Sequence, residues 1–143
     1  AFLYPDHDLS VDATFPGFDK IADNNASIVM KLSYGDSDIL LTGDAESPLE
    51  QYLISAYGEA LDVDVLHVGH HGSNSSSVQP FLNAVTPEHA VISVGKENDY
   101  GHPTLRVLRR LERAGARVWR TDEDGDVTAL VYPQDIIISS ERL

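Results

Sequence analysis

Three short polar clusters each follow an apolar stretch of this 143-residue chain, and their side chains are of types that bind metal ions or move protons. The clusters are Thr42-Gly43-Asp44, His70-His71-Gly72-Ser73 and Asn98-Asp99-Tyr100-Gly101-His102-Pro103. Asp oxygens and His nitrogens are ligands of zinc, manganese and iron. A carboxylate can bridge two such ions about 3.5–4 Å apart, and the pair activates water for phosphoester cleavage. The clusters therefore indicate metal-dependent hydrolysis.

Each cluster taken alone also has a purely structural interpretation. Asp44 precedes a predicted helix, where a carboxylate favours the helix dipole, and His102 precedes Pro103 and could cap the next helix. Adjacent side chains of an extended strand point to opposite faces, so only one of His70 and His71 is expected to be a ligand. The other would support that ligand or face the substrate.

The stretch Gly72–Ser77 before a predicted helix allows a different function. Backbone N–H groups at a helix start bind phosphate without any metal, so a non-catalytic anion-binding module is an alternative. The stretch lacks the pattern of a nucleotide-binding Walker loop, and no Gly-x-Ser-x-Gly motif of serine hydrolases is present. The absence of Cys excludes thiol catalysis and zinc ribbons.

Strands and helices that alternate along the chain must position these clusters. Hydrophobic patterns predict strands near 28–34, 39–41, 63–68, 90–94, 117–120, 127–132 and 136–138, with helices near 47–58, 76–85 and 103–115. An irregular segment is expected over 1–25 and one domain over 26–143, with an α/β layer architecture. Because the clusters follow strand ends, we expect them to meet at one edge of the sheet.

The charge is strongly acidic, with 10 Lys and Arg against 23 Asp and Glu and a net charge of −13. Such a surface repels nucleic acid at long range, although bound divalent cations would offset the acid locally. Basic residues concentrate in one predicted helix and the strand after it, at Arg106, Arg109, Arg110, Arg113, Arg117 and Arg120. No apolar run approaches the roughly 18 residues of a membrane span.

In combination the motifs resemble the metallo-β-lactamase-fold domain of the ComEC family of competence proteins. The resemblance covers residues 24–130 and rests on six strings: Asn24-Asn25-Ala26-Ser27-Ile28-Val29, Leu40-Leu41-Thr42-Gly43-Asp44, Asp64-Val65-Leu66-His67-Val68-Gly69-His70-His71-Gly72-Ser73, Ile92-Ser93-Val94-Gly95, Asn98-Asp99-Tyr100-Gly101-His102-Pro103 and Arg120-Thr121-Asp122 with Gly125. It implies the C-terminal half of an αββα sandwich, with a mixed sheet flanked by helices. It also implies two divalent ions, Zn²⁺ or Mn²⁺, and hydrolysis of phosphodiesters.

The resemblance also implies roles for individual residues. Asp44 matches the carboxylate that bridges the metals, and His71 matches a metal-ligating histidine. His70 would lie beside the metals as a catalytic residue, and His102 would lie near the scissile phosphate as an acid or hydrogen-bond donor. Ser73 and Asn98 would support these groups without touching the metals.

One departure from the family is that its first ligand motif, His-x-His-x-Asp-His, does not occur in this chain. We therefore expect this chain alone to be inactive, to bind no metal tightly, and to need the missing N-terminal half of the sandwich or a second copy as partner. The parent is expected to be a membrane protein that acts on DNA at the extracytoplasmic face of the cytoplasmic membrane, whereas this piece is soluble. Alternatives are a phosphorylcholine esterase, a small-molecule phosphodiesterase or the anion-binding module.

Overall fold

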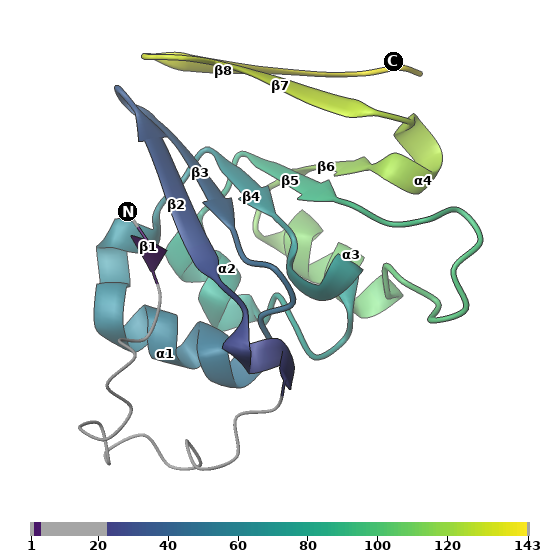
Figure 1. Ribbon diagram of the computed structural model, residues 1–143, viewed down its shortest axis with the longest axis horizontal. Helices are drawn as coiled ribbons and strands as arrows, with labels where there is room; N and C mark the ends of the chain where they lie inside the picture. Colours follow the sequence, from purple (N-terminus) through teal and green to yellow (C-terminus); the bar gives the residue numbers. More distant parts are fainter. Residues whose placement is uncertain (1, 4–22, 143) are drawn as a thin grey trace.

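The computed structural model describes residues 2–3 and 23–142, and six of its strands form one mixed sheet (Figure 1). In their order across the sheet, the strands are β1 (Phe2–Leu3), β2 (Val29–Tyr34), β3 (Ser37–Leu41), β4 (Val65–His67), β5 (His89–Ile92) and β6 (Arg117–Arg120). Neighbouring strands pair antiparallel from β1 to β3 and parallel from β3 to β6.

The helices that connect the parallel strands all cover one face of this sheet (Figure 1). The connections from β3 through β6 contain, in turn, α1 (Ser47–Tyr57), α2 (Gln79–Val85) and α3 (Leu105–Arg113). Crossovers between parallel strands are almost always right-handed. Because each crossover here steps in the same direction across the sheet, all three helices arrive on the same face.

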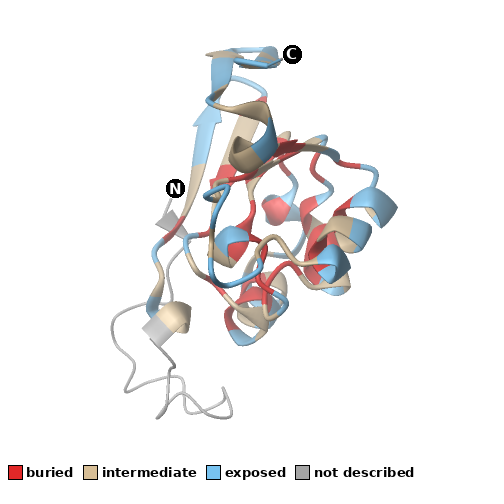
Figure 2. Cartoon of the chain, turned by 90° about the vertical axis from the view of Figure 1, so that its right-hand side faces the viewer, coloured by how far each residue is buried: buried red, intermediate tan, exposed pale blue. Residues whose placement is uncertain are grey.

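The hydrophobic core lies between the sheet and these helices, where Figure 2 shows the buried residues concentrated. Leu40, Leu66 and Ala90 are aligned across β3, β4 and β5, and all three are fully buried. The helices contribute Leu49, Leu53, Phe81, Leu82, Val107 and Leu111. Parallel strands whose helix-facing side is packed in this way hold their carboxyl ends at fixed positions.

A two-stranded antiparallel sheet of β7 (Val127–Tyr132) and β8 (Asp135–Ser140) lies on the other side of the main sheet from the helices (Figure 1). Its turn contacts the β2–β3 turn, where Asp36 N–H donates to the Pro133 carbonyl at 2.6 Å. Large apolar side chains of this hairpin are about half exposed at Leu130, Tyr132 and Ile137. A hairpin of two strands is marginal by itself, so this layer is open to further strands or helices.

The predicted α/β fold with a mixed sheet flanked by helices is confirmed, as are the β2–β3 hairpin and the order of strands and helices. Three details differ from the prediction. Ser47 before Pro48 has the pattern of a helix cap, but the capping position of α1 is Glu46. Phe2–Leu3 pair with β2 although the sequence predicts an irregular segment, and residues 4–22 lie outside the described part. The stretch between the predicted strands 117–120 and 127–132 contains a short helix, α4 (Thr121–Asp124).

Candidate active site

The carboxyl ends of β3, β4 and β5 bring the three polar clusters to one edge of the sheet. Thr42-Gly43-Asp44 follows β3, the 3₁₀ turn Gly69–Gly72 follows β4, and the loop that begins at Ser93 follows β5. The three strands are neighbours and parallel, so their following loops must lie side by side.

Asp44 and His71 face each other at this edge, with 3.9 Å between Asp44 Oδ1 and His71 Nε2. This distance exceeds that of a hydrogen bond. It is close to the separation of two ligands that each lie about 2.0–2.2 Å from one metal ion. His71 Nδ1 lies 2.7 Å from the Ser93 carbonyl oxygen, which can only accept. Nδ1 therefore carries a proton, and Nε2 is the ring nitrogen that faces Asp44.

The backbone of the His70-His71 pair explains how both imidazoles reach the same site. Both residues have left-handed conformations, with φ of +48° at His70 and +52° at His71. Hydrogen bonds hold this turn, from His70 N–H to the Gly43 carbonyl at 3.0 Å and from Ser73 N–H to the His70 carbonyl at 2.8 Å. The expectation that the two side chains alternate as on a strand is wrong, because the pair lies in a tight turn beyond β4.

His70 faces a carboxylate that sequence reasoning missed. Its Nδ1 lies 3.3 Å from Glu46 Oε1, the same oxygen that accepts from Ser75 Oγ at 2.8 Å and Asn24 Nδ2 at 3.2 Å. Burial raises the pKa of Glu46, but these hydrogen bonds and the charge of His70 outweigh it and hold the pKa below its usual value. The signal in the sequence is the carboxylate two positions after Asp44.

Ser73 and Asn98 both brace the site without touching Asp44 or His71. Ser73 Oγ lies 3.0 Å from Ser75 Oγ, and the latter in turn donates to Glu46. Asn98 Nδ2 donates to the Gly95 and His102 carbonyls, and Asn98 Oδ1 accepts from His102 N–H at 2.9 Å. Asn98 thus closes the loop that carries His102.

His102 lies against His70, with 5.8 Å between the ring centroids and an edge-on arrangement. Burial, with smaller contributions from His70 and His71, lowers the pKa of His102 below its ordinary value. A neutral imidazole at this position presents one donor and one acceptor nitrogen to a ligand. The third cluster therefore adds a second imidazole beside His70.

The described residues do not form a complete metal site. Within residues 2–3 and 23–142, no three His, Cys, Asp or Glu side chains converge on a point where a metal ion could sit. Asp44 and His71 fit a metal by donor type, spacing and the support of His71 by a carbonyl. A zinc site normally needs three or four protein ligands, so further donors would have to join them.

Two backbone N–H groups just before α2 are already occupied by a side chain of this chain. Ser77 N–H and Val78 N–H donate to the two carboxylate oxygens of Glu50 at 2.5 and 2.9 Å. Glu50 lies on α1 and is 1 % exposed. An internal carboxylate therefore fills the place where an external phosphate was expected.

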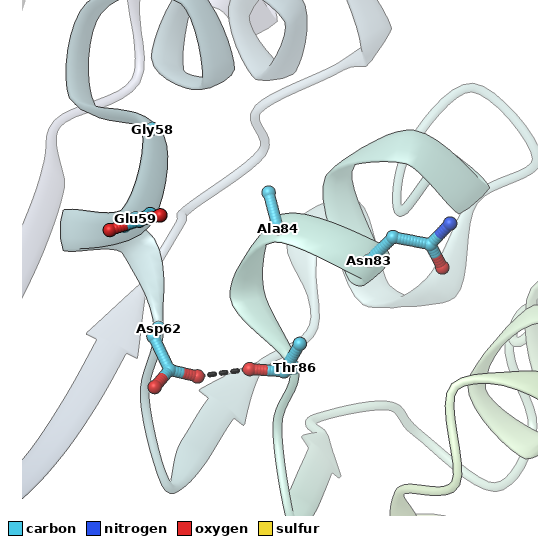
Figure 3. A pocket seen from close by; sticks show the side chains of 6 residues that line it. All are labelled: Gly58, Glu59, Asp62, Asn83, Ala84 and Thr86. Atoms are coloured by element: carbon cyan, nitrogen blue, oxygen red, sulfur yellow. Dashed lines mark hydrogen bonds between the residues drawn. The ribbon is translucent and has the colours of Figure 1, made fainter.

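A depression of about 670 Å³ lies at the opposite edge of the sheet, before β4 and β5 (Figure 3). Asp62 and Thr86 are joined by a hydrogen bond at its floor, and Glu59 and Asn83 contribute its other polar side chains. It contains no imidazole, and its carboxylates are separated from the Asp44 cluster by the length of the strands. The depression is therefore distinct from the candidate active site.

Comparison with known proteins fits this geometry. The family model of the metallo-beta-lactamase superfamily matches residues 5–96, which include Asp44, His70 and His71. The chain belongs to the metallo-β-lactamase superfamily. The resemblance to ComEC-type competence proteins is also confirmed by the relatives that follow.

The curated relatives are much longer proteins. The chain is 46% identical over 105 residues to competence protein ComA of Neisseria gonorrhoeae, which covers 73% of this chain and 15% of that protein. It is 40% identical over 121 residues to ComE operon protein 3 of Bacillus subtilis, with 85% and 15% covered. Recombination protein 2 of Haemophilus influenzae is 37% identical over 121 residues, again with 85% and 15% covered. The chain thus spans about 15% of the length of these relatives.

None of the helices in the described part of the chain combines the length and the apolar character needed to cross a bilayer.

Proposed function

We propose that this chain supplies part of a two-metal phosphodiesterase site, the nuclease domain of a ComEC-type DNA-uptake protein. The observation that carries the proposal is the Asp44–His71 pair, 3.9 Å apart, with His71 oriented by the Ser93 carbonyl. The superfamily match and the names of the relatives support the hydrolase class and the competence role.

In this proposal Asp44 and His71 hold divalent ions, Zn²⁺ or Mn²⁺, together with ligands from residues outside the described ones. When bound, such ions make water nucleophilic at neutral pH. His70 and His102 lie beside each other at the same edge of the sheet, with 5.8 Å between their ring centroids, and in this proposal they hydrogen-bond a phosphate oxygen and pass a proton to the leaving oxygen. Glu46 Oε1 lies 3.3 Å from His70 Nδ1 and places a negative charge beside this imidazole.

The open layer of β7 and β8 supports the proposal that another sheet layer completes the domain. We propose the N-terminal half of the sandwich as its natural partner, with a homodimer of this chain as the substitute when that half is absent. The half-exposed Leu130, Tyr132 and Ile137 would be covered by it. By the same resemblance, the parent protein would work at the extracytoplasmic face of the cytoplasmic membrane, with DNA as its substrate.

Calorimetric titration of Mn²⁺ and Zn²⁺ tests the metal site directly. The proteins to compare are this chain, its Asp44→Asn and His71→Ala variants, and a form extended by whatever residues the gene encodes ahead of Ala1. We expect weak binding to the chain, tight binding to the extended form, and a loss of at least tenfold in affinity in both variants of each.

The matched control is Asp36→Asn, which removes an exposed carboxylate in the β2–β3 turn and is expected to leave metal affinity unchanged. Metal affinity that is the same in the chain, Asp44→Asn and His71→Ala would refute the assignment of these two ligands. If metal binding by the extended form depends on Asp44 and His71, nuclease assays on that form follow.

A further inference from the structure

A pocket of about 300 Å³ adjoins the Asp44–His71 pair and is walled by the loop after β5. His71 and Ser93 form the side of the pocket shared with the candidate metal site. Asn98, Tyr100 and His102 of the loop also line the pocket. The volume lies at the lower end of the range of small-ligand sites, enough for one nucleoside and too small for a base pair in a helix.

Tyr100 is the most exposed large apolar side chain among the described residues, at 83 %. It is nevertheless presented by a braced loop, because Asn98 makes three hydrogen bonds that tie Gly95 to His102 across it. The Tyr100 ring is nearly parallel to the His102 ring, with 6.0 Å between centroids and 24° between planes. Its exposure therefore leaves a fixed aromatic face beside the groups proposed to handle the phosphate.

The polar groups around this ring select between possible ligands. A quaternary ammonium such as choline is normally held by several aromatic faces and a counter-charge. The described lining of this pocket contains one phenol ring and no carboxylate. A nucleobase, in contrast, needs only one flat partner and nearby hydrogen-bonding side chains, and His71, Asn98 and His102 of the lining can supply these.

We propose that Tyr100 is a stacking platform for an unpaired nucleobase next to the scissile phosphodiester, which makes single-stranded nucleic acid the substrate class of this site. The inference rests on the proposed phosphodiesterase function and extends it from the phosphate to the base. A paired base inside a duplex has both faces covered by its neighbours, so only a single strand or a frayed end can offer a free face to the ring.

Binding of the trinucleotide d(TpTpT) to the metal-free chain tests this inference. The binding is measured from NMR chemical-shift changes at about 0.3 M salt. The salt screens the repulsion between DNA and a chain of net charge −13, whereas stacking is little affected. We expect Tyr100→Ala to weaken binding about tenfold or more and Tyr100→Phe to stay within about twofold, because stacking on one ring contributes roughly five- to hundredfold. An abasic analogue of the trinucleotide should bind to the chain, Tyr100→Ala and Tyr100→Phe with the same affinity.

The matched control is Tyr34→Ala, which removes another exposed tyrosine at the opposite end of the strands and should leave binding unchanged. Equal binding of the trinucleotide by the chain and Tyr100→Ala, or no shift near Tyr100 at millimolar trinucleotide, would overturn the inference. Mn²⁺ titration of the same variants separates it from the proposed function. Tyr100→Ala should bind Mn²⁺ with the same affinity as the unchanged chain. A loss of trinucleotide binding alone in this variant would support the role of Tyr100 in binding the base. Mn²⁺ binding that does not depend on Asp44 and His71 would instead refute the proposed metal site.

Discussion

Glu50 makes the stability of this domain depend on pH in a direction opposite to that of most carboxylates. The side chain is buried between α1 and the start of α2, where it accepts from Ser77 N–H and Val78 N–H. Burial raises the pKa of Glu50 to about 7, and the two backbone donors and the charge of Arg110 offset this only in part. Glu46 is the other charged group that acts on it, and it raises the pKa further.

The sign and size of the effect follow from the linkage between protonation and folding. The folded state binds a proton at Glu50 up to about pH 7, whereas the unfolded chain releases it near 4.5, the ordinary pKa of a glutamate side chain. The stabilisation of the folded state by protonated Glu50 is therefore fully present below pH 4.5 and is lost as the pH rises through 7. The difference between these pKa values corresponds to about 3 kcal/mol of unfolding free energy.

Urea unfolding from pH 4.5 to pH 8.5 measures how the free energy of unfolding depends on pH, with the fluorescence of the single, buried Trp119 as the signal. We compare the chain with Glu50→Gln, whose amide does not titrate. The stability of the chain relative to Glu50→Gln should fall by about 3 kcal/mol over this range, mostly between pH 5 and 7. The exposed Glu59→Gln is the control and should give a flat difference. A flat difference for Glu50→Gln would refute the reasoning, and a rise would show that the hydrogen bonds outweigh burial.

Two further predictions concern α3 and the open hairpin layer. Arg110 donates to the carbonyls of the 74–77 loop, including Ser76 at 3.0 Å, so Arg110→Ala should lower the unfolding free energy by about 1–2 kcal/mol in urea unfolding. Arg109→Ala, on the exposed side of the same helix, should change it by less than about 0.5 kcal/mol, and equal losses would contradict this. The chain should self-associate in light scattering, and Leu130→Ser should reduce the apparent mass while Leu105→Ser, an equally exposed site on α3, should not. A monodisperse monomer would count against an unpartnered layer.

Local patterns were sufficient to predict the fold because the decisive signals act over few residues. Alternating apolar residues on both sides of Gly35-Asp36 predict the β2–β3 hairpin, and Pro48 and Gly58 mark the two ends of α1. Strand–helix alternation then predicts parallel strands whose carboxyl ends meet, which places the three polar clusters at one edge. That placement required no knowledge of side-chain contacts.

The carboxylates Glu46 and Glu50 could not be predicted in the same way. Each is defined by partners more than twenty positions away, Asn24 and Ser75 for Glu46 and Ser77 with Val78 for Glu50. In the sequence, Glu50 follows Leu49 at the start of an amphipathic helix and has the pattern of a solvent-facing residue. Its burial depends on backbone N–H groups that only the folded chain brings to it.

The left-handed turn at His70 and His71 was also not predicted from the sequence, and it bears on function. A non-glycine residue at positive φ costs about 1 kcal/mol or more, and here two consecutive residues adopt it. Glycine would relieve that cost but would remove the imidazoles that face Asp44 and Glu46. Strain of this kind persists where the surroundings enforce it, as the hydrogen bond from His70 N–H to Gly43 does here. Glycine would be less strained at both positions, and the presence of two histidines there is the physical argument for proposing that the chemistry takes place at this turn.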